Sequence, residues 1–221
     1  MFEKEQQYYK FVIIVRLTLF KLPMNLQTNN CSVIILAAGN SGRMGEPKSL
    51  LKWNENETFI QKIISEYKEF GCKNIIAVIN QEVLDLYKSY SYNFFNDITI
   101  VLNNHLEWER FYSVKLGLVA LKNKEFCFIQ NVDNPYVNTH LLELLYKEKE
   151  ESSFCVPFYK DKGGHPILVN KKIIDSIVNI NENDLNLKNV LSPFVKKKIA
   201  VSDETILYNI NNKREYKRLL K

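Results

Sequence analysis

The sequence is poor in cysteine and glycine and has no long uncharged apolar run. Its four cysteines, at positions 31, 72, 127 and 155, form no C-x-x-C pair and give no metal-ligand spacing. We therefore interpret them as buried free thiols of a protein that resides in the reducing cytoplasm. The net charge of +5 is modest, and much of it comes from lysines and arginines near the C-terminus. Such clusters are usually solvated faces, so the charge does not predict a nucleic-acid partner.

The most apolar stretch of the N-terminal region, residues 11–22, is interrupted by Arg16 and Lys21. It is too short and too charged to span a bilayer, which needs about 20 apolar residues, and it lacks the features of a signal peptide. We expect no membrane association. Three interpretations stay open for the stretch: an added edge strand or helix, an interfacial segment, or sequence upstream of a start at Met24. We treat residues 1–30 as an extension without assigned function and residues 31–221 as a single domain.

Three of the seven glycines lie in one short segment, residues 33–48, which reads VIILAAGNSGRMGEPK. The β-branched apolar run predicts a strand buried on both faces, and the small residues after it let a backbone approach a ligand closely. Such a turn points successive N–H groups at one spot, which suits phosphate. Arg43 and Lys48 add fixed positive charge. The segment therefore predicts a polyphosphate-binding loop at the carboxyl end of a strand.

The spacing of these glycines differs from the P-loop and from the G-x-G-x-x-G dinucleotide motif. It resembles the L-A-A-G-x-S-x-R-M-G-x-P-K signature of the MobA-like NTP transferase family at every fixed position. The resemblance implies an enzyme that joins a nucleoside monophosphate to a phosphorylated acceptor. It also implies a nucleotide-binding segment formed by Leu36, Ala37, Ala38, Gly39, Ser41, Gly42, Arg43 and Lys48.

Strand-like and helix-like segments alternate from position 31 onward. The periodicity predicts strands over 33–37, 74–79, 98–102, 126–130, 154–159, 166–169 and 206–210, and helices over 59–70, 81–90, 111–122, 139–151, 171–178 and 187–194, with a basic terminal helix. Gly71 is a plausible helix C-cap. This alternation predicts an α/β fold with a mostly parallel sheet covered on both sides. With the resemblance, we expect a Rossmann-like three-layer α/β/α nucleotidyltransferase fold of GT-A type.

Asp133 follows an apolar strand and precedes Asn134-Pro135, which places a carboxylate at the same edge of the sheet as the glycine loop. Nucleotidyl transfer concentrates negative charge, so a Mg²⁺ ion held by one or two carboxylates is expected. The resemblance makes Asp133 the first metal ligand. The second is Asn211, because Asn209 and Asn211 stand where relatives of the molybdenum cofactor type carry aspartates. Two interpretations stay open for this exchange: an amide ligand, or a metal site weakened by divergence.

Two further residues gain a role only through the resemblance. Gly163-Gly164-His165-Pro166 is similar to the Gly-His-Pro turn of the molybdenum cofactor cytidylyltransferase branch, where His165 would donate to an acceptor phosphate. Ser113 matches a family serine at a helix start near the nucleobase. By themselves, the histidine is an ordinary turn residue and the serine an ordinary first-turn residue.

The resemblance implies a Mg²⁺-dependent nucleotidyltransferase. Backbone amides near Gly39, Ser41 and Gly42 would hold the β- and γ-phosphates, Arg43 would neutralise pyrophosphate, and Lys48 would stabilise the α-phosphate. The favoured partners are CTP and molybdopterin, with a molybdoenzyme as recipient of the product. The alternatives are a transferase acting on a sugar phosphate or alcohol phosphate, and a nucleotide-binding protein with weakened catalysis.

Overall fold

The computed structural model describes residues 30–42, 44–72, 74–89, 98–122, 124–150 and 153–219. The predicted N-terminal extension lies outside these ranges except for its last residue, so its role stays a prediction. Within the described ranges, no helix combines the length and the apolar character that crossing a membrane requires.

The described residues form one mixed sheet of eight strands with the order β3-β2-β1-β4-β7-β5-β6, in which β8 pairs with β5. Strands β1, β2, β3 and β4 are all parallel, and β8 is parallel to β5. Strand β7 is antiparallel to β4 and β5, and β6 forms a hairpin with β5. The strands are β1 (Cys31–Ala37), β2 (Asn74–Ile79), β3 (Thr99–Leu102), β4 (Phe126–Asn131), β5 (Ser153–Tyr159), β6 (Lys162–Gly163), β7 (Ile167–Asn170) and β8 (Val195–Ala200).

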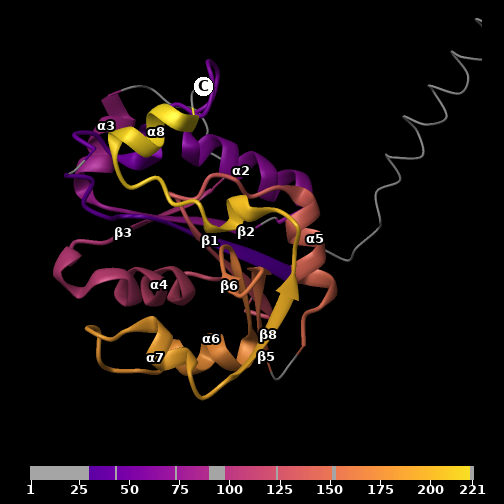
Figure 1. Ribbon diagram of the computed structural model, residues 1–221. Coiled ribbons are helices and arrows are strands. Elements are labelled where there is room, and N and C mark those ends of the chain that lie inside the picture. Colours follow the sequence, from indigo (N-terminus) through magenta and orange to yellow (C-terminus); the bar gives the residue numbers. More distant parts are fainter. Residues whose placement is uncertain are drawn as a thin grey trace, which may run out of the picture.

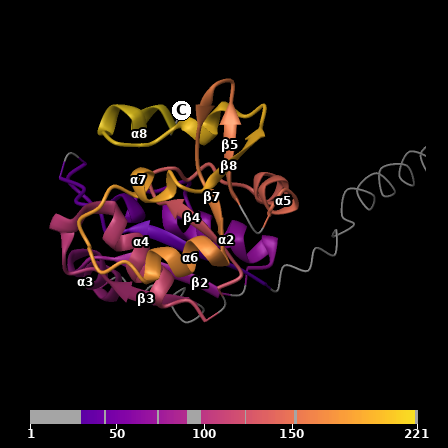
Figure 2. The same ribbon diagram turned by 90° about the horizontal axis from the view of Figure 1, so that it is seen from below.

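Helices cover both faces of this sheet (Figures 1 and 2). One core holds apolar side chains of α2, α3 and α5, and the other holds those of α4, α6 and α7. The α-helices are α2 (Phe59–Phe70), α3 (Gln81–Ser89), α4 (Glu109–Val119), α5 (Thr139–Lys147), α6 (Lys171–Val178), α7 (Leu187–Leu191) and α8 (Lys213–Leu219). The short 3₁₀ helices are η2 (Lys48–Leu50), η4 (Leu106–Trp108) and η5 (Glu204–Leu207). The predicted three-layer α/β/α architecture is confirmed.

Strand β1 lies at the centre of the sheet because its side chains are apolar on both faces. Val33 and Ile35 enter one core and Ile34 enters the other, and all three are fully buried. The neighbouring strands β2 and β4 both run parallel to it, so the chain departs to opposite sides of β1. Ligands of open α/β sheets bind at such a reversal, beyond the carboxyl ends of the strands.

The predicted helix over 59–70 is confirmed with its ends. Thr58 and Gln61 form a capping box at its start. Gly71 ends it in the left-handed region at φ 97°, where a residue without a Cβ carries no steric cost. The other predicted helices and all but the last of the predicted strands occur with shifts of a few residues at their ends.

The predicted last strand over 206–210 is wrong. Its first half belongs to η5, and the last strand of the sheet is β8, which carries Lys196, Lys197 and Lys198. Beside β5 this strand lies at an outer position of the sheet, where lysines protect an exposed edge from further pairing. The lysine cluster is therefore part of the sheet as well as a solvated face.

Candidate active site

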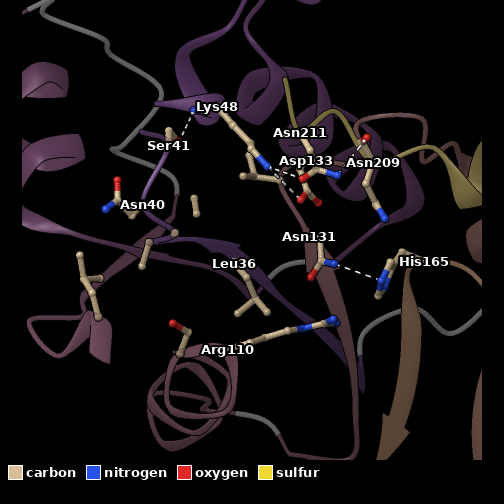
Figure 3. A pocket seen from close by; sticks show the side chains of 16 residues that line it. Leu36, Asn40, Ser41, Lys48, Arg110, Asn131, Asp133, His165, Asn209 and Asn211 are labelled. Atoms are coloured by element: carbon tan, nitrogen blue, oxygen red, sulfur yellow. Dashed lines mark hydrogen bonds and ion pairs between the residues drawn. The ribbon is translucent and has the colours of Figure 1, made fainter. Parts of the chain in front are cut away.

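A cavity of about 500 Å³ opens at the carboxyl ends of β1 and β4 (Figure 3). The structure brings together the following predicted site residues in its lining: Leu36, Ala37, Ala38, Gly39, Ser41, Lys48, Ser113, Asp133, His165 and Asn211. Gly42 does not line the cavity, and Arg43 lies outside the described residues. Six residues that were not predicted as site residues also line it: Asn40, Leu106, Arg110, Asn131, Val132 and Asn209.

The glycine loop is held in place by a turn and an apolar anchor. The backbone amides of Met44 and Gly45 donate to the carbonyl oxygen of Ser41 at 2.7 and 3.2 Å. Gly45 has φ 79°, a conformation that side chains with a Cβ rarely adopt. The Met44 side chain is buried in the core, and Ser41 Oγ accepts the amide of Lys48 at 3.1 Å. These contacts fix Ser41, Met44 and Lys48 in place before any ligand arrives.

The outer part of the loop leaves space for a ligand. A Cβ added to Gly39 would meet no protein atom within 4 Å, so the packing of the protein does not require a glycine there. A closely approaching ligand would require it. Gly42 differs, because its amide donates to Asn40 Oδ1 at 3.1 Å and is thereby occupied. In this arrangement the Gly42 amide is not free to bind phosphate, so fewer amides of the loop are available for that role than the sequence predicts.

Lys48 joins three distant segments of the chain. Its Nζ donates to Asp133 Oδ2 at 3.3 Å and to Asn211 Oδ1 at 2.8 Å (Figure 3). Its side chain is only 17% exposed, and that of Asp133 is 25% exposed, so solvent screens this pair less than a surface ion pair. The lysine therefore points into the cavity from the end of the glycine loop.

The donor set fits a divalent cation that arrives with phosphate. Asp133 Oδ1 is buried and has no hydrogen-bond partner, and Asn211 Oδ1 lies close to the same carboxylate through Lys48. In the described part of the chain, no cluster of three or more His, Cys, Asp or Glu side chains could hold a metal ion. A Mg²⁺ ion bound by one or two protein oxygens completes its shell with substrate phosphates and water.

Asn134 holds the segment that carries Asn211. Its buried Nδ2 donates to the carbonyl oxygens of Thr205, Ile206 and Tyr208 at 3.1, 3.1 and 2.9 Å. The Ile210 amide then donates to the Asp133 carbonyl oxygen at 2.8 Å. These bonds set residues 205–210 against the turn that follows β4, and so bring Asn211 to the cavity.

His165 lies on the opposite side of the acidic turn from the glycine loop. Its Nε2 accepts from Asn131 Nδ2 at 3.1 Å, so the ring proton is on Nδ1, which is buried and has no partner among the described residues. Burial, together with the nearby charge of Arg110, lowers the pKa of His165 to about 3. The ring is therefore neutral at physiological pH and is a hydrogen-bond donor rather than a cation.

The position of His165 depends on close backbone approach at Gly164. A Cβ at Gly164 would lie 2.4 Å from the Ile206 carbonyl oxygen, so no larger residue fits without a shift of the backbone. The His165 amide donates to that same oxygen at 3.1 Å. The Gly-His turn and the Asn134 contacts therefore meet at η5.

The model of the MobA-like NTP transferase domain matches residues 33–198, which is most of the chain and includes the glycine loop, the acidic turn and the Gly-His-Pro turn. The chain belongs to this family. It is a nucleotidyltransferase, and the structure already described has the mixed α/β fold of such enzymes.

The chain matches curated relatives over nearly their full length. The molybdenum cofactor cytidylyltransferase of Escherichia coli (strain K12) is 26% identical over 183 residues, which are 83% of this chain and 92% of the relative. The probable molybdenum cofactor guanylyltransferase of Clostridium perfringens (strain 13 / Type A) is 26% identical over 203 residues, 86% of this chain and 96% of the relative.

Solved structures share the fold. The Rv0371c protein of Mycobacterium tuberculosis H37Rv superposes with a TM-score of 0.72 at 20% identity, over 86% of this chain and 98% of that one. Its complex with manganese superposes with a TM-score of 0.67 at 17% identity, with the same coverage. The 2-C-methyl-D-erythritol 4-phosphate cytidylyltransferase of Francisella tularensis gives 0.62 at 16%, over 86% and 97%.

Arg110 is the one arginine among the six described cavity residues of this nucleotidyltransferase that sequence reasoning missed. It precedes Ser113 by three positions on α4, and residues three apart share a helix face. Its side chain extends from α4 toward Asn131 and His165 (Figure 3). Burial lowers its pKa and the Asp133 carboxylate opposes this, yet an arginine stays charged. The spacing to Ser113 is the signal that could have found it.

Ser113 is anchored rather than free. Its Oγ accepts from the buried Asn103 Nδ2 at 2.9 Å, so its own proton remains available to a ligand. Ser113 belongs to α4 and lines the cavity from that helix. Lys48 and Asp133 reach the cavity from the loop and the turn beyond the strands (Figure 3). The cavity thus has one hydroxyl donor on one side and a cation with a carboxylate on the other.

Proposed function

We propose that this nucleotidyltransferase transfers a nucleoside monophosphate from a nucleoside triphosphate to a phosphorylated acceptor and releases pyrophosphate. The observation that carries the proposal is the convergence of Lys48, Asp133 and Asn211 beside the open Gly39 end of the glycine loop. Positive charge, a carboxylate and free space for polyphosphate meet there at the carboxyl edge of the sheet.

In the proposed reaction, an oxygen of the acceptor phosphate forms a bond to the α-phosphorus of the nucleotide. The bond from that phosphorus to the bridging oxygen of the β-phosphate breaks, and pyrophosphate leaves with the electron pair. Lys48 stabilises the charge that gathers on the α-phosphate, and the backbone of residues 39–41 holds the β- and γ-phosphates. The acceptor supplies its own nucleophile, so catalysis consists of positioning and electrostatic stabilisation.

Asp133 and Asn211 are the residues that would hold a Mg²⁺ ion, as the buried unpartnered Asp133 Oδ1 suggests. When bound, this ion supplies charge neutralisation on the phosphates. The protein contributes the position of both oxygens, because Asn134 and the Ile210 amide fix the two segments that carry them. Arg43 of the glycine loop is proposed to neutralise pyrophosphate.

The proposed substrates are CTP and molybdopterin, with a molybdoenzyme as recipient of the product in the cytoplasm. The names of the E. coli and C. perfringens relatives support a molybdenum cofactor nucleotidyltransferase, and they differ in the base. His165 is proposed to donate to the acceptor phosphate and Ser113 to bind near the base. A sugar phosphate or alcohol phosphate is the alternative acceptor, because chains of this fold include a methylerythritol phosphate enzyme.

The direct test measures pyrophosphate release by the purified chain with each of CTP, GTP, ATP and UTP and with molybdopterin, a sugar phosphate or an alcohol phosphate. We expect release with CTP and molybdopterin in the presence of Mg²⁺. Lys48→Ala should lower kcat/KM by about 10²- to 10³-fold, the usual cost of losing one transition-state charge contact, without changing the far-ultraviolet circular dichroism. Near-normal turnover by Lys48→Ala would overturn the assignment of the loop.

A second function is favoured by the site's having a single carboxylate, Asp133, among its described lining residues. Its partner Lys48 also donates to the Asn211 amide oxygen. A nucleotide-binding protein with weakened catalysis would bind CTP but release no pyrophosphate with any acceptor. Titration calorimetry of CTP binding, run beside the turnover assay, separates the two functions. Binding without release in all combinations supports the second.

A further inference from the structure

Two of the four cysteine thiols are in contact with each other at the amino ends of β1 and β2, at the opposite edge of the sheet from the cavity. Cys31 Sγ and Cys72 Sγ are 3.0 Å apart, although the two residues are 41 positions apart in the sequence. Both residues are buried, with 2% and 3% of their surface exposed. The thiols of Cys127 and Cys155 donate instead to backbone carbonyl oxygens. The contact therefore singles out one pair of thiols among four that are all buried.

The backbone holds each of the two thiols in place. Cys31 is the first residue of β1, where it pairs with Phe126 of β4. Cys72 follows Gly71 at the end of α2, and its amide donates to the Tyr67 carbonyl oxygen at 2.9 Å. A left-handed glycine followed by such a bond is a common helix ending. The two sulfurs thus meet because a strand start and a helix end are each fixed by their own hydrogen bonds.

We propose that Cys31 and Cys72 form a redox modification site, at which hydrogen peroxide converts the two thiols into an intramolecular disulfide. The S–S bond of a disulfide is about 2.05 Å long, so a shift of roughly 1 Å brings the two sulfurs within bonding distance. The proposed function assigns no role to either cysteine, and this inference does not depend on it.

The reaction has two steps. The sulfur of one thiol attacks a peroxide oxygen, the O–O bond breaks, and the departing hydroxide takes the thiol proton and leaves as water. The product is a sulfenic acid. The sulfur of the second thiol then attacks the sulfenic sulfur, the S–O bond breaks, and a second water leaves with the second thiol proton. The two thiols are oxidised to one disulfide, and the peroxide is reduced to two molecules of water.

Burial makes the pair slow to react and selective for a small oxidant. The hydrogen bond with Cys31, together with burial, raises the pKa of the Cys72 thiol. Since the thiolate is the reactive form, the intact fold protects the pair from exchange with larger disulfides. Ends of helices and strands open locally at a lower cost than their centres. We therefore expect hydrogen peroxide, which is small and uncharged, to reach the pair when the start of β1 or the end of α2 opens.

The disulfide would stabilise the fold without touching the cavity. It would close a loop of the chain that contains α2 and the glycine loop, and such a crosslink reduces the freedom of the unfolded chain. Cys31 and the cavity lie at opposite ends of β1. In a reducing compartment such a crosslink is transient, because thiol reductants remove it. The pair would thus strengthen the fold only while an oxidant is present.

The test compares the full chain before and after treatment with hydrogen peroxide. The remaining thiols are blocked with N-ethylmaleimide in denaturant, and the peptides are identified by mass spectrometry. We expect Cys31 and Cys72 in one crosslinked peptide pair, two hydrogen atoms lighter than the reduced peptides, with the other cysteines alkylated. The oxidised chain should melt about 5–15 °C higher, because the crosslink spans 41 positions. Dithiothreitol should reverse both the crosslink and the shift in Tm.

Cys31→Ala and Cys72→Ala should each abolish the crosslink and the shift. Cys127→Ala and Cys155→Ala are the matched controls, because each removes a buried thiol outside the pair, and both should keep the crosslink and the shift. Alkylation of all four cysteines after peroxide treatment, a crosslink through another cysteine, or addition of oxygen that dithiothreitol does not reverse would overturn the inference. So would a crosslink that leaves Tm unchanged or lower. None of these measurements involves pyrophosphate release, so the inference and the proposed function can fail separately.

Discussion

Lys48 lies between Asp133 and Asn211. A negative ligand would bind its ammonium group there, whereas a metal cation would compete with that group for the two oxygens. Its ammonium group lies 3.3 Å from the carboxylate and 2.8 Å from the amide oxygen. With one carboxylate and one ammonium group, the pair has no net charge of its own. Cation affinity depends strongly on the number of charged ligands. The amide at position 211 therefore limits how tightly the free protein can hold a divalent cation.

Asn211→Asp should raise the affinity of the nucleotide-free chain for Mn²⁺ by about tenfold or more, since it adds a second carboxylate to the site. Electron paramagnetic resonance of Mn²⁺ titrated with protein measures this directly. The control is Asn212→Asp, because Asn212 Oδ1 accepts from the amides of Arg214 and Glu215 at the start of α8 instead of lining the cavity. An equal gain in both variants would mean that position 211 has no special role.

His165 makes the stability of the chain sensitive to acid. Burial lowers its pKa to about 3, whereas an unfolded histidine has a value near 6.5, so the unfolded state binds more protons between these values. The free energy of unfolding should therefore fall as the pH falls from about 6.5 toward 3, by at most about 1.4 kcal/mol per pH unit from this group. His165→Gln should flatten that slope in urea titrations. His140→Gln, at an exposed position, should leave it unchanged.

At the residue level, sequence reasoning named most of the residues that line the cavity but missed Arg110 and the role of Asn134. The glycines, Lys48 and Asp133 follow from local rules, because loops and acidic turns after apolar strands meet at one edge of a parallel sheet. Arg110 and Asn134 do not. Arg110 is an ordinary polar residue at a helix start, and the contacts of Asn134 are with carbonyl groups more than 70 positions later.

Among the elements, the segment from η5 to Asn211 depends on side chains rather than on its own backbone pattern. Its apolar residues Ile206, Leu207 and Ile210 resemble a strand, which explains the wrong prediction over 206–210. In the structure, Asn134 takes the place of a neighbouring strand by donating to three of its carbonyl oxygens. Strand β8 was missed for the opposite reason, because three consecutive lysines hide the alternation of an edge strand.

Asn134→Ala should loosen this segment. Loss of the buried amide removes three hydrogen bonds and should lower the free energy of unfolding by about 1–3 kcal/mol. Amide hydrogen exchange over residues 205–210 should accelerate, and turnover should fall because Asn211 is no longer fixed. Asn138→Ala is the matched control: it removes the bond to the Leu141 amide that caps α5, at a cost of about 1 kcal/mol, without contacting this segment. Equal exchange in the two variants would contradict the role of Asn134.

Across the whole molecule, the order of strands explains why the site forms where it does. Alternating strand-like and helix-like segments predicted the α/β class and a mostly parallel sheet, and in the structure β1 pairs in parallel with both β2 and β4. The antiparallel placement of β7 between β4 and β5 was not predictable from periodicity, since both orientations bury the same side chains. That placement brings His165 beside Asn131.

A nucleotide should stabilise the whole fold. At a concentration about 100 times its dissociation constant, a ligand that binds only the folded state adds about 2.7 kcal/mol, or roughly 5–10 °C in Tm for a chain of this size. CTP with Mg²⁺ should give such a shift in a thermal melt, and cytidine, which lacks the phosphates, should give little. Lys48→Ala should remove most of the shift. A full shift with cytidine would place recognition away from the glycine loop.

The bond between Lys48 and Asn211 joins positions 163 residues apart, and the bond from Lys48 to Asp133 spans 85. Closing loops of this length has an entropic cost that is recovered only after the strands between them have paired. We therefore expect the three side chains to meet late in folding, because a partly folded species with β1 to β4 alone lacks Asn211 at the site. Recovery of catalytic activity during refolding should therefore report when the complete molecule has formed. Recovery of the helical circular dichroism signal should not.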